Sequence, residues 1–230
     1  MRNPASTLVL LALALGLSTP MPAQDHRPKD YKGTAFKDSL QSGGAQVIPG
    51  RVRCAFYDLG GEAIAFHDSD AKNSGSGALN PLNGKYLNEF RKGEAVDTSY
   101  TKFWDGIDDS PYNLVKPEEA QLYVGWTEPG EWINLTVAVK TAGEYTLNLL
   151  YTSNRGGSIG LDLNGKQLTG PLTLVSTAND QDPFAWRQWH HWNKLTKLAT
   201  VKLPKGISVL TLRVLTEGNM NFDYLEFVAK

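Results

Sequence analysis

The strongest constraint on the fold of this chain is a set of runs in which apolar and polar residues alternate. In EWINLTVAV, residues 131–139, the side chains of Ile133, Leu135, Val137 and Val139 fall on one side, and mostly polar side chains lie between them. A period of two is typical of a β-strand with one buried face. The run therefore predicts a half-buried strand rather than a helix.

Similar runs continue along the C-terminal half of the chain: EYTLNLLYT, SIGLDLNGKQL, ATVKLP, ISVLTLRVL and FDYLEFV. The pair Asn164-Gly165 predicts a hairpin turn inside the second of these, because Asn and Gly tolerate positive φ. No ten-residue window after the N-terminal segment shows a convincing helical stripe. We therefore expect an all-β fold, a β-sandwich or jelly roll of two antiparallel sheets with long loops.

The chain divides into three parts. Residues 1–23 carry one positive side chain, an apolar run from about Leu8 to Leu17 and a small-residue end, which is the layout of a secretory signal peptide. That run is too short for a membrane span, so we expect a secreted or periplasmic protein. Residues 24–50 are polar with little periodicity and predict an N-terminal arm, and residues 51–230 are the predicted domain.

Charge and cysteine content exclude some partners and some stabilising bonds. The net charge of −1 argues against a nucleic-acid partner, which needs clustered positive charge. Cys54 is the only cysteine, so the chain cannot form an internal disulfide and depends on its core.

The segment AWRQWHHWN, residues 185–193, holds half of the six tryptophans and invites a search for metal and catalytic sites. Adjacent residues on a strand point to opposite faces, so His190 and His191 are poorly placed to bind one ion. No HExxH or CxxC motif supports zinc. Hydrolysis of glycosides needs two opposed carboxylates. The spacing singles out no pair, so a secreted hydrolase using carboxylates near residues 78–119 stays an alternative.

The tryptophans in that segment indicate a surface that another molecule covers. On a strand, Trp186 and Trp192 share one parity and Trp189 has the other, so one face is buried while a ring stays outside. Aromatic rings pack against the C–H faces of sugars, and neighbouring polar groups recognise the hydroxyls. Packing within the domain or between subunits, as in a structural or interaction protein, remains open.

Several segments together resemble carbohydrate-binding module family 6: YDLGGEAIAFHDSDAKNSG, GEAVD, YVGWTEPGEWINLTVAVKTAGEYTLNLLYTS, AWRQW and GNMNFDYLEF. The resemblance extends from about Val52 to Val228. It implies a secreted jelly-roll domain that binds a plant- or algal-type polysaccharide or oligosaccharide without cleaving it. A glycoside hydrolase is the partner that the resemblance suggests.

The resemblance also assigns a ligand site in the loops at the edge of the sandwich. Two aromatic residues clasp a sugar ring there, and the matching positions are Trp126 and Trp186. An asparagine two residues before the closing aspartate hydrogen-bonds the sugar, and the matching position is Asn221.

One departure from the family pattern concerns calcium. Many members carry an Ala-Glu pair whose carboxylate joins the closing aspartate in a structural calcium site, but here the matching residues are Cys54-Ala55. Asp223 is retained, and Glu62 is a candidate replacement ligand. Because calcium prefers six or more oxygens, we expect a weakened or absent site at Asp223 and no required cofactor.

Further candidate ligand residues lie outside this clasp. The insert from about residue 78 to 119 contains Trp104 and Tyr112, and is expected to wall the cleft or to block it. Trp132 belongs either to a second surface on the concave face or to internal packing.

Overall fold

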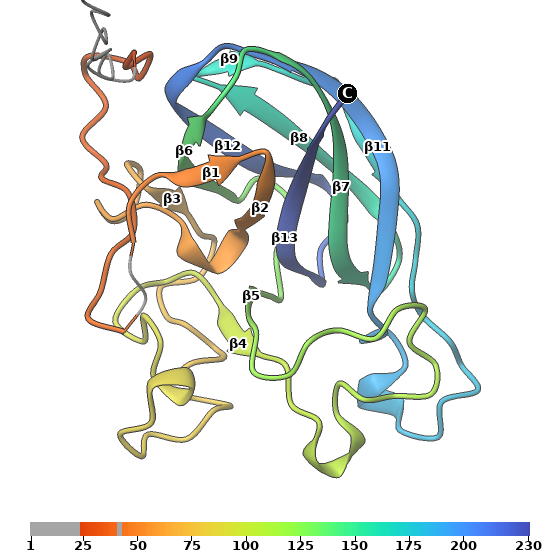
Figure 1. The fold of residues 1–230 in the computed structure, drawn as a ribbon. Helices are drawn as coiled ribbons and strands as arrows, with labels where there is room; N and C mark the ends of the chain where they lie inside the picture. Colours follow the sequence, from red (N-terminus) through yellow and green to blue (C-terminus); the bar gives the residue numbers. More distant parts are fainter. Residues whose placement is uncertain (1–23, 41–42) are drawn as a thin grey trace, which may run out of the picture.

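The computed structural model describes residues 24–40 and 43–230, so the predicted signal peptide lies outside the described residues. In the described part, two β-sheets pack face to face (Figure 1), and every helical segment is a 3₁₀ turn of three residues. The all-β sandwich predicted from the sequence is confirmed. Within the same ranges, no helical segment has the length and apolar character of a membrane span.

The first sheet has the strand order β1-β6-β12-β8-β10, with β3 paired to β6 and β9 paired to β8. Its pairs are antiparallel except β1 with β6, which is parallel. The strands are β1 (Gln46–Ile48), β3 (Phe66–His67), β6 (Trp132–Val139), β8 (Gly157–Leu163), β9 (Lys166–Gln167), β10 (Leu172–Leu174) and β12 (Gly206–Thr216).

The second sheet has the order β11-β7-β13-β5-β4, with β2 paired to β13, and is antiparallel throughout. Its strands are β2 (Gly50–Arg53), β4 (Thr98–Tyr100), β5 (Leu122–Val124), β7 (Gly143–Ser153), β11 (Asn193–Leu203) and β13 (Met220–Ala229). The 3₁₀ turns are η1 (Cys54–Phe56), η2 (Tyr86–Asn88), η3 (Trp104–Gly106) and η4 (Ala185–Arg187).

The core lies between the sheets, and the period-two pattern correctly identifies its face on β6. Ile133, Leu135 and Val137 are at most 5% exposed. The opposite face of β6 is also covered, because the Asp58 carboxylate accepts hydrogen bonds from the Thr136 main-chain N–H at 2.7 Å and hydroxyl at 2.6 Å. A strand predicted as half-buried is therefore buried on both faces.

The segment before the sandwich lies along it. Asp25 forms a β-bridge with Ile207, and Thr34 forms one with Leu59. Further on, β1 adds a parallel strand beside β6. Residues 24–50 thus contribute an edge strand to the first sheet.

The segment AWRQWHHWN is not a strand, contrary to the parity interpretation of its tryptophans. It contains η4, and β11 begins only at Asn193. Instead, its polar side chains bond to Asp108 of the 78–119 insert and to Asp182 earlier in the same loop, and these bonds hold it in an irregular conformation. The long loops gather at one end of the sandwich, the lower end in Figure 1.

Candidate functional site

The loops at this end enclose a cleft with a volume of about 880 Å³. Two of the three residues matched to the family's ligand site, Trp126 and Trp186, line it, and so does Trp104 from the 78–119 insert. The insert therefore walls the cleft. The aromatic lining is Tyr100, Trp104, Tyr123, Trp126, Trp186 and Trp189, and the polar lining is Asn80, Asn83, Lys85, Asn88, Ser99, Lys102, His190 and Asn219.

Trp126 follows β5 in an unusual backbone conformation. Its φ is +48°, in the left-handed region that costs a residue with a Cβ of order 1–3 kcal/mol. The Trp126 N–H donates to Asn221 Oδ1 at 3.2 Å. At the preceding Gly125, a Cβ would lie 2.6 Å from the same oxygen. The Gly-Trp pair thus allows the backbone to turn closely over Asn221.

Asn221 lies beneath the cleft rather than on its wall, with an exposed fraction of 1%. Besides accepting from Trp126, its amide donates to Thr152 Oγ1 and to His190 Nδ1, each at 2.8 Å. All its hydrogen-bonding groups therefore have protein partners. The structure places Asn221 as a support for Trp126 and His190, and direct contact of its amide with a sugar stays a prediction.

A buried aspartate of the insert holds His190 from the other side. The Asp108 carboxylate accepts from His190 Nε2 at 2.6 Å and from Trp192 Nε1 at 2.7 Å. Because Asn221 donates to Nδ1, the His190 proton resides on Nε2. Burial opposes ionisation of Asp108, but His190 and Trp192 hold the pKa of its carboxyl below the usual range.

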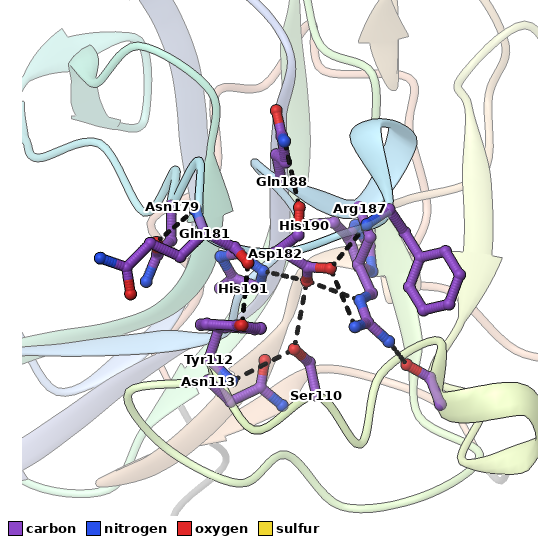
Figure 2. Close-up of polar contacts among 12 residues, drawn as sticks. Ser110, Tyr112, Asn113, Asn179, Gln181, Asp182, Arg187, Gln188, His190 and His191 are labelled. Carbon is purple, nitrogen blue, oxygen red and sulfur yellow. Dashed lines mark hydrogen bonds and ion pairs between the residues drawn. The ribbon is translucent and has the colours of Figure 1, made fainter.

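Trp186, 57% exposed, is presented by η4 from a second polar cluster. In this cluster the next residue, Arg187, donates from Nε and Nη2 to both oxygens of Asp182, at 2.7 and 2.9 Å (Figure 2). Its Nη1 donates to the carbonyl of Gly106, the last residue of η3. One guanidinium thus joins the loops that present Trp186 and Trp104.

Asp182 is the centre of this second cluster. It also accepts from His191 Nε2 at 2.9 Å, and the Ser110 hydroxyl lies 3.5 Å away (Figure 2). Burial alone would raise the pKa of Asp182, but hydrogen bonds from Arg187 and His191 lower it well below the usual range. Since His190 and His191 serve different carboxylates, they do not form a shared metal site.

Three predicted site residues lie elsewhere. Tyr112 does not line the cleft; its hydroxyl donates to the Gln181 carbonyl at 2.9 Å. Trp132 borders a separate cavity of only about 20 Å³, which is too small for a sugar ring. The Glu62 carboxylate lies 2.5 Å from His67 Nδ1 on β3.

The surroundings of Asp223 do not fit calcium. Arg53 Nη1 donates to Asp223 Oδ1 at 3.2 Å and to Gln121 Oε1 at 2.8 Å. The positively charged guanidinium of Arg53 therefore lies directly beside both oxygens. Burial raises the pKa of Asp223 to about 7 despite Arg53. Among the described residues, no three His, Cys, Asp or Glu side chains are placed to hold an ion.

No aspartate or glutamate of the described residues lines the cleft. Among the described side chains, the cleft lining thus offers no opposed pair of carboxylates of the kind that glycoside hydrolysis uses. The sequence did not single out Asp108, Asp182, Lys102 or Asn219. The available signals were the acidic run in WDGIDDSP and the spacing of Asp and Arg in DPFAWR.

No family model matches the chain, and no curated protein matches it. The solved structures that it resembles include CsCBM6-3 from Clostridium stercorarium in complex with cellobiose. That structure is 11% identical, with coverage of 81% of this chain and 98% of the module and a TM-score of 0.49. A family 35 carbohydrate-binding module from Clostridium thermocellum is 19% identical, with coverage of 51% and 84% and a TM-score of 0.39.

Another similar structure is a carbohydrate-binding module of Cellvibrio mixtus lichenase 5A in complex with cellotriose. It is 16% identical, with coverage of 59% of this chain and 87% of the module and a TM-score of 0.41. At these identities and TM-scores the similarities assign neither a family nor a ligand to this chain. The resemblance of its sequence to family 6 stays a prediction.

Proposed function

We propose that this protein binds a carbohydrate in the loop-end cleft without cleaving it. The observation that carries the proposal is the composition of the cleft: six aromatic side chains, several amides and hydroxyls, and no carboxylate among the described residues. Flat apolar rings with a few polar groups suit the alternating C–H faces and hydroxyls of a sugar.

The two outer walls are held by separate networks. Trp126 rests on the Asn221–His190–Asp108 chain of hydrogen bonds, whereas Trp186 rests on the Arg187–Asp182 pair. The loop segments that carry both rings are thus held before a ligand enters, which lowers the entropic cost of binding. In this proposal Asn221 positions Trp126, and exposed Asn219, whose side chain has no hydrogen bond within the described residues, reads sugar hydroxyls.

The first test is a glycan-array screen of residues 24–230, followed by calorimetry on the best ligand. Removing the Trp186 ring by Trp186→Ala should weaken binding at least tenfold, since each stacked ring contributes about 1 kcal/mol beyond its buried area. The control is Leu114→Ala, because Leu114 is a 64% exposed apolar residue of the insert that does not line the cleft. Thermal unfolding should be unchanged in both variants.

Failure to bind any glycan would refute the proposal and favour an interaction protein, which size-exclusion chromatography would then detect as an oligomer. Release of reducing ends from a bound glycan would instead favour a hydrolase. Export of the protein and cooperation with a glycoside hydrolase stay predictions.

A further inference from the structure

Lys102 is the one lysine among the described residues that is buried, at 8% exposed, and it lines the cleft. Its ammonium group donates to Asn80 Oδ1 at 2.7 Å and to Ser99 Oγ at 3.2 Å. It also lies 4.5 Å from the centre of the Tyr100 ring. All three partners are neutral, and two acceptors leave one of the three ammonium N–H groups without a protein partner in the described chain.

Among the described side chains, no carboxylate forms an ion pair with the Lys102 ammonium, whose contacts are Asn80, Ser99 and the Tyr100 ring. The nearest carboxylate that acts on it, Asp108, uses Oδ2 to accept the Lys102 main-chain N–H at 2.7 Å, and its Oδ1 serves His190 and Trp192. Desolvation lowers the pKa of the Lys102 ammonium, and Asp108 opposes that shift. Buried cations are normally paired because an isolated charge is costly to remove from water. Within the described side chains, the Lys102 ammonium therefore has no anionic partner.

Three other cations near the loop end form ion pairs. Arg187, also buried, pairs with Asp182. The exposed side chains of Lys92 and Lys116 pair with Glu89 and Asp109. The two lysines in the cleft, Lys85 and Lys102, have no ion pair within the described residues. The cleft thus combines two unpaired cations with aromatic walls of low polarity, and such walls strengthen the field of a charge.

From this arrangement we propose that the cleft selects an anionic glycan and that Lys102 binds its charged substituent, a uronate carboxylate or a sulfate ester. The inference rests on the proposed sugar-binding function and names the class of sugar. Trp126 and Trp186 stack on the ring, the free N–H of Lys102 donates to an anionic oxygen, and Lys85 attracts the chain from the exposed edge. Charge-assisted hydrogen bonds of this kind are about twice as strong as neutral ones.

The test compares ligands that differ only in charge. The uronate pair is an oligogalacturonate and its fully methyl-esterified form, and the sulfate pair is a carrageenan oligosaccharide and its desulfated form. In at least one pair, the anionic member should bind at least tenfold more tightly, and the preference should shrink as salt rises from 50 to 500 mM. The pair that shows the preference identifies the substituent.

Lys102→Met should reduce this preference to less than twofold, whereas Lys102→Arg should retain most of it because the charge remains. Lys85→Met should produce a smaller loss, and Lys116→Met, outside the cleft, should produce none. Since Lys102→Met also removes two internal hydrogen bonds, its thermal unfolding is recorded. If Lys102→Met fails to fold, two measurements still test the selection of anions: the salt dependence of the preference for the charged ligand, and the effect of Lys85→Met on that preference.

The outcomes separate the two proposals. Binding of glycans with no preference for the charged member of either pair would refute the selection of anions and leave sugar binding intact. Equal loss of charged and neutral ligands in Lys102→Met would give Lys102 only a structural role. Binding of no glycan of any kind would refute the proposed function itself.

Discussion

The sandwich and its loop end are stabilised in different ways. Between the sheets, apolar side chains such as Leu135, Leu149 and Leu225 are fully buried and make no directed bonds. At the loop end, the carboxylates of Asp108 and Asp182 are equally buried, but each accepts hydrogen bonds from more than one side chain. The first region depends on apolar area and volume, and the second depends on the identity of individual polar groups.

This difference teaches where change is tolerated. Burial of apolar area is non-directional, so a core accepts swaps of similar volume at small cost. A buried carboxylate with several donors has no such freedom, because removing it leaves every donor unsatisfied. The sheets therefore act as a tolerant platform, whereas each wall of the cleft depends on one aspartate.

The largest expected effect comes from truncating a buried apolar side chain between the two sheets. Leu149→Ala should lower the free energy of unfolding by about 2–5 kcal/mol, because Leu149 on β7 is fully buried and leaves a cavity. The measurement is urea unfolding followed by tryptophan fluorescence. Lys202→Ala, an exposed position on the neighbouring strand β11, is the control and should change stability by less than about 0.5 kcal/mol. Equal effects in the two variants would contradict a core centred on β7.

A smaller and more local effect is expected from Asp182→Asn. The amide cannot satisfy Arg187 and His191 together, so we expect a loss of about 1–3 kcal/mol confined to the loop end. Hydrogen exchange of the amides of residues 182–191 should quicken while β7 and β13 stay protected, and glycan affinity should fall at least tenfold.

The control for that variant is Asp180→Asn, an exposed aspartate two residues away whose carboxylate has no hydrogen bond within the described residues. It should leave both readouts unchanged. Cooperative unfolding of the whole chain in Asp182→Asn would show that the two regions are not energetically separate.

The same contrast explains what the sequence predicted. The alternation in residues 131–139 predicted a strand and its core face, and Asn164-Gly165 predicted a hairpin, with φ values of +54° and +75°. These features are local, since each follows from side chains next to one another in the chain. The pattern did not predict that Thr136 and Asn134 would be covered, because Asp58 and Thr211 reach them from distant segments.

The cleft could be predicted only in part. The resemblance pointed to Trp126 and Trp186, which do line one cleft, but strand parity failed in AWRQWHHWN. Periodicity has no meaning where the backbone is fixed by side chains from elsewhere. The bonds from Asp108 to His190 and from Arg187 to Gly106 span 82 and 81 residues, and no local pattern signals them.

The last expected effect is graded with pH, and two groups of buried carboxyls contribute to it in opposite directions. Burial, foremost, raises the pKa of Asp68 to about 7, of Asp97 to about 6 and of Asp223 to about 7. In the unfolded chain these carboxyls titrate near 3.9. Between pH 4 and 7 the folded state thus holds more protons than the unfolded state, so the free energy of unfolding should fall as pH rises.

Asp108 and Asp182 have lowered pKa values, so their contribution is present above about pH 4 and is lost as pH falls further. The thermal midpoint should therefore rise from pH 8 to about pH 5, whereas protection of the loop amides should decline below pH 4. Asp223→Asn should flatten the first dependence and leave the second unchanged, since Asp223 lies on β13 and touches neither loop network. A thermal midpoint that falls steadily from pH 8 to pH 5 would contradict the assigned buried carboxyls.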